Sequence, residues 1–199
     1  MSQADQARPA VDDSIVRRAR FTIRYKRESD ARDDYAWRTD PEIARFDGNA
    51  PLTDPFEAFF VSFEHQRRYG VVGREAFSVD DAEGRHIGNV MYYNADSVGG
   101  EAEFGIGICS PEHQDRGLGT EATVAFLDFL WRERPFHRVV LHTLAWNVRA
   151  IACFEHAGFS QVARVLRRGE WFIRMEARRE WWLMWQAEGR FEERALRQE

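Results

Sequence analysis

The sequence predicts one α/β domain of the α+β type, in which strands and helices share a single core. Residues 101–108 alternate polar and apolar side chains, with Phe104, Ile106 and Ile108 on one face, which is the period of a β-strand. Residues 122–131 instead carry apolar side chains at helical spacing. The chain has 199 residues, 44% of them hydrophobic, and this is enough for one well-buried core.

Ahead of this strand, the sequence predicts a first strand, three helical segments and a β-hairpin. Helices are expected to begin at residues 29–30, 40–41 and 54–55, because Ser or Asp caps a helix start and Pro fits its first turn. A turn at Gly84 predicts the hairpin. The three strands are expected at residues 19–26, 75–80 and 86–93.

After the long helix, the chain predicts a buried strand over residues 137–144 and a short helix that Asn147 caps and Gly158 ends. An aromatic hairpin is then expected, with strands at residues 161–172 and 180–185 and an Arg-rich connection over 175–179. The predicted organisation is a flexible N-terminal tail over residues 1–13, one domain over 14–185, and a charged, solvated C-terminal tail over 186–199.

The most informative motif is QDRGLGTEA, residues 114–122, which connects the strand to the long helix. Gly117 and Gly119 lie in this turn, where glycine lets the backbone approach a ligand closely. The unpaired N–H groups of the helix start, together with the positive end of the helix dipole, favour a phosphate. We interpret the motif as a pyrophosphate cradle, with an ordinary Gly-containing loop as the alternative.

Two other kinds of phosphate-binding loop also contain glycines in a strand-to-helix turn. No Gly-Lys-Ser/Thr follows the glycines, which argues against a P-loop NTPase. Residues 117–122 do fit the loose Gly-x-Gly-x-x-Ala form of a dinucleotide fold, although residues 109–116 separate the strand from the first glycine. A dinucleotide-binding oxidoreductase therefore stays as a second alternative.

The order strand, Gly-rich turn, helix, strand, short helix is also the order of the GNAT acyltransferases. The sequence resembles this superfamily most strongly over residues 103–159, where the family's Gln-x-x-Gly-x-Gly loop is present as Gln114, Gly117 and Gly119. WRTDPEIARF, residues 37–46, and the Asn147 helix are similar to its RimJ/RimL-type branch. The resemblance implies a GNAT fold, with a mixed central β-sheet and helices on both faces, and acetyl-CoA as co-substrate.

The resemblance also implies which residues hold acetyl-CoA. In this family a bulge in the strand before the cradle splays it from its neighbour, and pantetheine pairs with the exposed backbone. Gly105 and Gly107 are the expected bulge residues. An N–H near Ile106 or Ile108 is expected to face the thioester carbonyl. The expected cofactor-binding residues are Ile106, Ile108, Gln114, Asp115, Arg116, Gly117, Leu118, Gly119, Thr120, Asn147, Arg149 and Phe154.

Acyl transfer to an amine needs a base, because amines are protonated at neutral pH. Glu103 is the expected catalytic base, since RimJ/RimL-like proteins often carry a strand glutamate there, and a solvent-facing charge is its alternative. Glu101 is a weaker candidate of the same kind, and His142 is another, with a hydrogen-bonded semi-core residue as its alternative. Many GNAT proteins have a tyrosine acid where this chain has Phe154, so a water or a substrate-derived proton is expected instead, with Cys153 directed elsewhere.

The acceptor site is expected between the first helices and the terminal hairpin. Its substrate-binding residues are expected to be Trp37, Glu42 and Phe46. The tryptophans of the terminal hairpin are candidates for a further wall, with core or dimer packing as the alternative: Trp171, Trp181 and Trp182.

The expected function is an N-acetyltransferase that transfers an acetyl group from acetyl-CoA to a primary amine, such as a protein N-terminus, a polyamine or an amino-bearing small molecule. A catalytically weak acyl-CoA-binding sensor or scaffold is the alternative, suggested by Phe154. The net charge of −5 argues against nucleic acid as a partner. Cys109 and Cys153 lack paired metal spacing, so no metal is expected. A cytoplasmic protein with no membrane partner is expected, with a homodimer left open.

Overall fold

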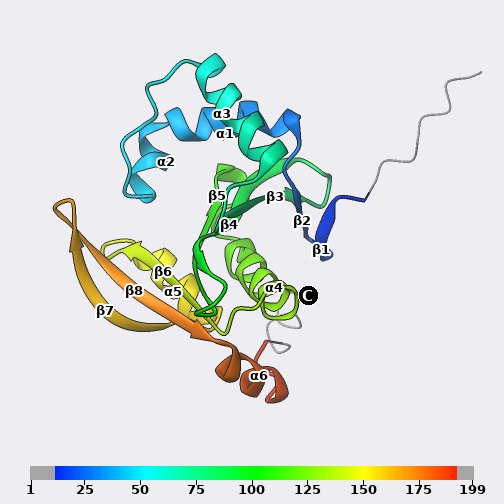
Figure 1. The fold of residues 1–199 in the computed structure, drawn as a ribbon. Helices are drawn as coiled ribbons and strands as arrows, with labels where there is room; N and C mark the ends of the chain where they lie inside the picture. Colours follow the sequence, from blue (N-terminus) through cyan, green and yellow to red (C-terminus); the bar gives the residue numbers. More distant parts are fainter. Residues whose placement is uncertain (1–11, 192–199) are drawn as a thin grey trace, which may run out of the picture.

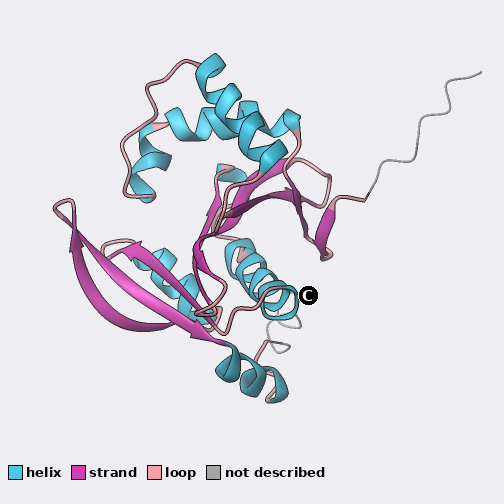
Figure 2. Ribbon diagram, in the orientation of Figure 1, coloured by secondary structure: helices cyan, strands magenta, loops and turns pink. Residues whose placement is uncertain are grey.

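The computed structural model describes residues 12–191 of the chain; the rest of the two predicted tails, residues 1–11 and 192–199, lies outside the described residues. An eight-stranded mixed sheet runs through the molecule in the order β1-β2-β3-β4-β5-β6-β8-β7 (Figures 1 and 2). The strands are β1 Ser14–Arg17, β2 Phe21–Tyr25, β3 Glu75–Asp81, β4 His86–Asp96, β5 Glu101–Ile108, β6 Arg138–Leu144, β7 Ser160–Arg167 and β8 Glu170–Arg178.

Helices lie on both faces of this sheet, as predicted. Helices α1 to α3 lie over one face, and α4 lies against the other (Figure 1). The helices are η1 Glu28–Asp30, α1 Ala31–Thr39, α2 Pro41–Phe46, α3 Phe56–Tyr69, η2 Pro111–His113, α4 Leu118–Glu133, α5 Val148–His156 and α6 Arg179–Ala187. No helix within residues 12–191 combines the length and the apolar character that crossing a membrane requires.

The core lies between the sheet and α4, and it fixes where the cradle lies. Alternate residues of β2, β3 and β5 face α4, so that Phe77 and Phe104 contact Phe126 with ring centroids 5.4 Å and 6.1 Å away. Phe77 and Phe126 are fully buried. Because burial of each such side chain contributes roughly 1.5–3 kcal/mol, the strand, turn and helix around the glycines are held firmly together.

The sheet opens between β5 and β6. These strands pair in parallel only where residues 101–103 meet residues 138–140, and both continue beyond that point. In the described sheet, the backbone of β5 past Glu103 has no strand partner on this side. The opening is visible in Figure 1.

The predicted position of the bulge was wrong. Gly105 and Gly107 pair in regular register with Met91 and Asn89, and the register shift instead lies in β4 between Tyr93 and Asp96. Asn94, with φ of 49°, is the extra residue. Asn is among the residues that tolerate this conformation best, which explains why the bulge forms there. The two glycines leave the face of β5 beside the opening free of side chains.

The C-terminal hairpin also differs from the prediction. Its turn is at Arg168 and Gly169, which both have positive φ values, 52° and 84°. Residues 175–179, predicted as a connection, mostly belong to β8, and residues 180–185, predicted as a strand, belong to α6. Aromatic residues favour strands, but Trp181 and Trp185 are one helical turn apart and contact each other at 6.4 Å between ring centroids.

Two terminal segments pack more closely than the tail assignments suggested. β1 is an additional edge strand that pairs with β2. Asp13 forms an ion pair with Arg27 at 2.8 Å. At the other end, Phe191 stacks on the buried Trp182 with ring centroids 4.2 Å apart. Residue 191 therefore belongs to the packed part of the chain rather than to a solvated tail.

Candidate active site

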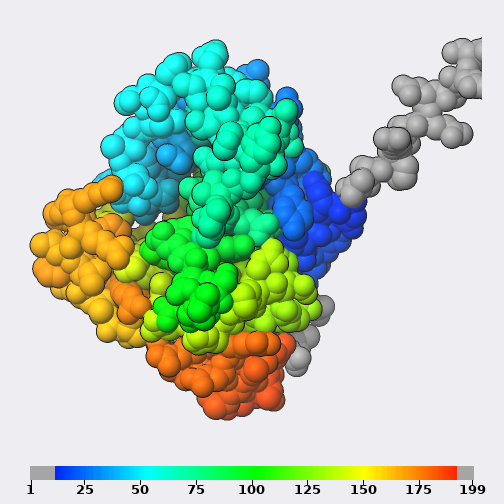
Figure 3. Space-filling view, viewed as in Figure 1, coloured from blue at the N-terminus to red at the C-terminus, as the bar shows by residue number. Residues whose placement is uncertain are grey.

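A cleft of about 1700 Å³ lies between helices α1 to α3 and the opened part of the sheet. In Figure 3 the surface is hollowed between these helices and the β7–β8 hairpin. One end of the cleft is lined by the cradle and α5, and the other by β4, β5 and the first helices. A single continuous space therefore adjoins both the predicted cofactor site and the predicted acceptor site.

The cradle has the backbone geometry that a phosphate site requires. Gly117, with φ of 77°, is the N-cap of α4, so the free N–H groups of the helix start face the cleft at Leu118 and Gly119. A Cβ atom added to Gly119 would point to Cys153 Sγ, 3.5 Å away. The cradle loop is also held by the segment that precedes β2, because a guanidinium N–H of Arg20 donates to the carbonyl oxygen of Arg116 at 2.8 Å.

Nearly all of the residues predicted to hold the cofactor come together in this cleft. Arg116 is the exception, because its exposed side chain does not line it. Arg149 lies over the ring of Phe46 at 5.6 Å and 3.3 Å from a carboxylate oxygen of Asp115, so its positive charge is beside the cradle. The lining residues from the prediction are Ile106, Ile108, Gln114, Asp115, Gly117, Leu118, Gly119, Thr120, Asn147, Arg149 and Phe154.

Helix α5 contributes a cap, a ring and a thiol. The side-chain oxygen of Asn147 accepts from the N–H of Ala150 at 3.1 Å, which confirms the predicted cap. Phe154 is buried against Phe104, with ring centroids 6.1 Å apart. Cys153, expected to point elsewhere, in fact lines the cleft, because α5 turns this face towards Gly119. Burial raises the pKa of its thiol, which therefore stays protonated near neutral pH.

Glu103 is held by three donors at the point where β5 and β6 separate. Its Oε1 accepts from the Tyr93 hydroxyl at 3.0 Å and lies 2.8 Å from His142 Nδ1, and its Oε2 accepts from the Asn94 amide at 3.1 Å. The hydrogen bond from His142, followed by those from Asn94 and Tyr93, lowers the pKa of Glu103 to about 2. Glu103 is therefore an ionised, partly buried carboxylate rather than a solvent-facing strand charge.

His142 presents its other nitrogen to an arginine. Arg167 lies 2.9 Å from His142 Nε2, and a guanidinium only donates, so Nε2 accepts and the ring proton is on Nδ1, facing Glu103. His142, Tyr93 and Asn94 line the cleft, whereas Glu103 lies behind them. The imidazole of His142 is thus the side chain that connects the Glu103 carboxylate to the cleft.

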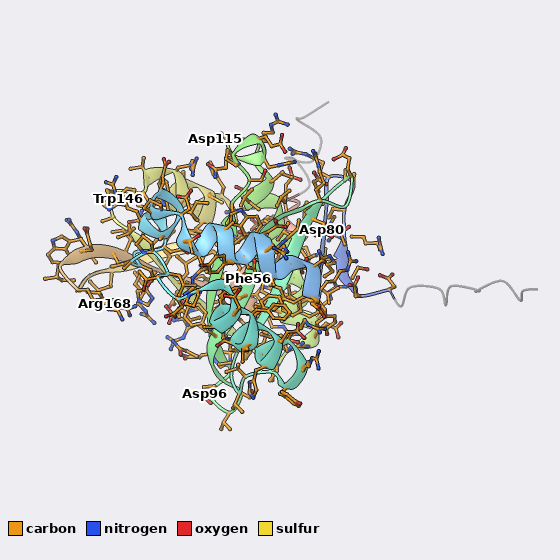
Figure 4. The ribbon with its side chains drawn as sticks, turned by 90° about the horizontal axis from the view of Figure 1, so that it is seen from above. Phe56, Asp80, Asp96, Asp115, Trp146 and Arg168 are labelled. Atoms are coloured by element: carbon orange, nitrogen blue, oxygen red, sulfur yellow. The ribbon has the colours of Figure 1, made fainter. Side chains whose placement is uncertain are left out.

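The predicted acceptor residues divide into those that reach the cleft and those that do not. Trp37 and Phe46 line it, and Phe46 packs on Trp146 with ring centroids 5.5 Å apart. Figure 4 shows Trp146 beside the end of α2. Glu42 is exposed on α2 and does not line the cleft.

The tryptophan wall predicted for the acceptor site was wrong. Trp181 and Trp182 lie on α6, below the opposite end of the sheet, and Trp171 is exposed on the hairpin. The hairpin residue that lines the cleft is Phe172. The loop after α2 reaches this ring, because a Cβ on Gly48 would be 2.8 Å from it. The residue register, and not the apolar character, therefore decides which aromatic side chain faces the site.

Buried charges support the floor of the cleft on the side of β2. Lys26 Nζ lies 2.6 Å from Asp34 Oδ2, and both residues line the cleft. Burial lowers the pKa of Lys26, although the charge of Asp34 opposes this. Among the described side chains, no group of three or more His, Cys, Asp or Glu residues is placed to hold a metal ion.

Comparison with known proteins identifies the class. A family model described as an acetyltransferase (GNAT) domain matches residues 20–160, which is most of the chain, so the chain belongs to the GNAT acetyltransferase family. It is therefore an acetyl-CoA-dependent N-acetyltransferase that acts on an amine. A dinucleotide-binding oxidoreductase is excluded, because β5–β6 is the sole parallel pair among the described strands.

Two curated acetyltransferases are similar to this chain. The chain is 28% identical over 121 residues to a spermidine N(1)-acetyltransferase of Vibrio cholerae, a match that covers 60% of this chain and 68% of the relative. It is 38% identical over 84 residues to a mycothiol acetyltransferase of Beutenbergia cavernae, but this match covers 42% of this chain and only 27% of that protein.

Solved structures confirm the GNAT fold. A spermidine N-acetyltransferase from Vibrio cholerae in complex with CoA and spermine superposes with a TM-score of 0.73 at 22% identity, covering 82% of this chain and 98% of that chain. An aminoglycoside acetyltransferase in complex with coenzyme A superposes with a TM-score of 0.68 at 18% identity, with the same coverage of each chain.

Proposed function

We propose that this acetyltransferase acts on a protein N-terminus, a polyamine or an amino-bearing small molecule, and that Glu103 and His142 together manage the proton of the acceptor amine. The observation that carries this proposal is the Glu103–His142 hydrogen bond at 2.8 Å, at the point where the sheet opens onto the cleft. The relatives' acceptors, which include spermidine, are consistent with a primary amine.

In this proposal, the residues of the cradle bind the co-substrate. The N–H groups at the start of α4 and the guanidinium of Arg149 hold its diphosphate. The unpaired backbone of β5 near Ile106 and Ile108 holds the pantetheine arm and donates to the thioester carbonyl. Acetyl-CoA itself supplies the activated acyl carbon. The positive φ of Gly117 and the absence of a side chain on Gly119 support the fit.

The different roles proposed for Glu103 and His142 follow from the low basicity of the Glu103 carboxylate. A carboxylate with a pKa of about 2 is a poor base near neutral pH, so Glu103 acts best by orienting His142 and stabilising its protonated form. His142 Nε2 then accepts the proton of the amine. Phe154 has no proton to give, so we propose that the CoA thiolate receives the substrate-derived proton from His142 or a proton from water.

This proposal is tested with His142→Asn and Glu103→Gln in steady-state assays of CoA release with a panel of amines. Asparagine keeps a donor towards Glu103 but cannot carry the proton, so kcat should fall about a hundredfold or more while acetyl-CoA affinity is unchanged. Glu103→Gln should lower kcat as well, and should shift the pH profile of kcat/KM, because His142 loses its ionised partner.

Glu101→Gln is the matched control, since Glu101 lies on the same strand and pairs with Arg138 outside the cleft. Its kinetics should stay near those of the wild type. Wild-type kcat in His142→Asn would contradict the proposed role of the pair. Binding of acetyl-CoA without turnover of any amine would instead favour a sensor or scaffold.

We further propose a family branch, the bounds of the domain, an oligomeric state and a cellular location. Residues 37–46 support a place in the RimJ/RimL-type branch, and one continuous core cluster supports a single domain over residues 14–185. The exposed apolar side chains Val61 and Tyr69 support a homodimer, which sedimentation would detect. The free thiols Cys109 and Cys153 support a cytoplasmic location, which cell fractionation would test.

A further inference from the structure

Carboxylates around the acceptor end of the cleft already have partners. Asp34 is paired with Lys26 at 2.6 Å, and Glu75 is paired with Arg134 at 2.8 Å. Glu103 accepts from three donors. These three carboxylates are therefore poorly placed to receive the ammonium groups of a polycation.

Two arginines nearby have no carboxylate partner among the described residues. Arg74 lines the cleft, and its guanidinium contacts Met91 Sδ, a weak acceptor, at 3.9 Å. Arg167 is exposed, and its guanidinium donates at 2.9 Å to Nε2 of His142, which lines the cleft. Met91 and Tyr93 lie beside each other, because a Cβ on Gly105 would be 3.5 Å from Met91 Cγ and 3.6 Å from Tyr93 Cε1. The Tyr93 hydroxyl and His142 Nδ1 both contact Glu103 Oε1. Arg74, on Met91, and Arg167, on His142, therefore adjoin the same cluster of side chains.

The remaining acids lie elsewhere on the wall. Asp47 and Asp54 line the cleft on the segment between α2 and α3. Desolvation by the surrounding walls raises the pKa of Asp47, and the nearby charge of Arg38 opposes this rise. A polyamine whose reacting amine lay beside His142 would bring its other positive charges close to Arg167, which repels them.

We infer that the preferred acceptor carries a carboxylate close to its reacting amine, as an amino acid does, and that Arg74 and Arg167 receive this carboxylate. The inference rests on the proposed function of the same cleft. Guanidinium groups bind carboxylates through two parallel hydrogen bonds, and such charge-assisted bonds are about twice as strong as neutral ones. A carboxylate is therefore a better partner for Arg167 than the neutral His142 ring.

This preference connects recognition to catalysis. His142 Nε2 is covered by Arg167, so it accepts a proton only after the guanidinium has moved. When Arg167 turns to the acceptor's carboxylate, the imidazole is released beside the amine. The amine nitrogen then attacks the thioester carbon, the C–S bond breaks as the amide bond forms, and the amine proton passes to His142 and on to the CoA thiolate.

The decisive experiment compares acceptors that differ only by a carboxylate. Initial rates of CoA release are measured with lysine against cadaverine and with phenylalanine against phenethylamine, with spermidine as the polycation. The carboxylate-bearing member of each pair should have a kcat/KM at least about tenfold higher. Equal or higher kcat/KM for cadaverine, phenethylamine or spermidine would overturn the inference.

Variants locate the effect. Arg74→Gln and Arg167→Gln should raise KM for the amino acid about tenfold or more, and should leave KM for its decarboxylated partner unchanged or lower. Arg68→Gln is the control, because Arg68 is exposed, pairs with Glu64 on α3 and lies outside the cleft lining. An equal loss with both acceptors would mean a merely structural role and would overturn the assignment.

These experiments distinguish failure of the carboxylate inference from failure of the proposed function. Efficient acetylation of spermidine, insensitive to Arg74→Gln and Arg167→Gln, would overturn the carboxylate inference and leave the acetyltransferase function intact. Stabilisation by acetyl-CoA in a thermal-shift assay without acetylation of any amine in the panel would overturn both.

Discussion

Gly119 is a position where a substitution is expected to change cofactor binding without changing the stability of the fold. An added Cβ would lie 3.5 Å from Cys153 Sγ and 4.0 Å from Ile108 Cγ1, which are ordinary contact distances. Gly117 differs, because its φ of 77° strains any other side chain. A methyl group at position 119 therefore changes the cradle while the protein tolerates it.

We predict that Gly119→Ala raises the acetyl-CoA Kd about tenfold or more, since the methyl group occupies space beside the N–H groups that hold the diphosphate. The melting temperature without ligand should stay within about 2 °C of the wild type. Isothermal titration calorimetry and thermal unfolding measure the two quantities. Gly117→Ala is the contrast, and it should lower both affinity and stability. Unchanged acetyl-CoA affinity in Gly119→Ala would refute the cradle assignment.

At the residue scale, the sequence predicts which residues are candidates for the site better than it predicts which side chains contact them. The glycines of the cradle were predicted from their local pattern, and Glu103 from the resemblance to the family. Their surroundings were not, because the register between two strands 30 residues apart depends on core packing. The parallel pairing of Glu103 with Val140 puts His142 just past the opening of the sheet. Tyr93 was missed because the bulge at Asn94 that shapes its end of β4 leaves no Gly or Pro signal.

At the scale of elements, the start of α1 is fixed to the sheet by a buried ion network. Arg24 on β2 is bidentate to both Asp30 and Asp80, with distances of 2.6–2.9 Å, and its side chain is 3% exposed. Ser78 also donates to Asp30 at 2.6 Å. The network holds the helical layer that covers the acceptor end of the cleft.

We predict that Arg24→Ala lowers the free energy of unfolding by about 3–5 kcal/mol, because Asp30 and Asp80 both lose their bidentate partner, and Arg27 remains only at 3.8 Å from Asp80. Urea unfolding followed by circular dichroism measures this loss. Arg17→Ala removes an arginine from the exposed pair with Asp12, and it should cost less than about 1 kcal/mol. Similar losses in the two variants would show that the network does not hold the layer.

One element, helix α6, was misassigned from the sequence pattern. The helices α1 to α5 were expected from their caps and periodicity, and their positions are confirmed. Helix α6 was predicted as a strand, because its tryptophans suit both structures and the preceding arginines resemble a connection. The signal that settles the hairpin is the turn at Gly169, eleven residues before the second predicted strand. Burial of Trp182 against the core then favours the helix.

At the scale of the whole molecule, lowered carboxylate pKa values make stability depend on pH. Burial alone raises the pKa of Asp30, but hydrogen bonds from Arg24, Ser78 and the backbone outweigh it and leave the pKa lowered. The pKa of Glu103 falls from 4.5 to about 2. A group whose pKa is lowered by folding stabilises the native state above its unfolded pKa and loses this effect as the pH falls.

We predict that the free energy of unfolding decreases as the pH is lowered from 4.5 to about 2, because protonation of Glu103 competes with its hydrogen bonds. Glu103→Gln should make this decrease shallower, since glutamine does not titrate. Unfolding curves at a series of pH values measure the slope, and Glu101→Gln should keep the wild-type slope. An identical slope in Glu103→Gln would mean that this carboxylate is not coupled to folding.

The opening between β5 and β6 has a mechanical consequence. Within the described sheet, its two halves are joined by three residue pairs, at residues 101–103. On the open side, contacts between α2 with its following loop and the second half span the gap: Phe46 on Trp146, Arg45 over Trp146, and Gly48 against Phe172. The two halves of the sheet are thus joined by a short hydrogen-bonded ladder at one side and by contacts of aromatic rings at the open side. Because the shared core and the ladder hold the two halves at the closed side, the contacts of α2 and its following loop define the width of the cleft at the open side.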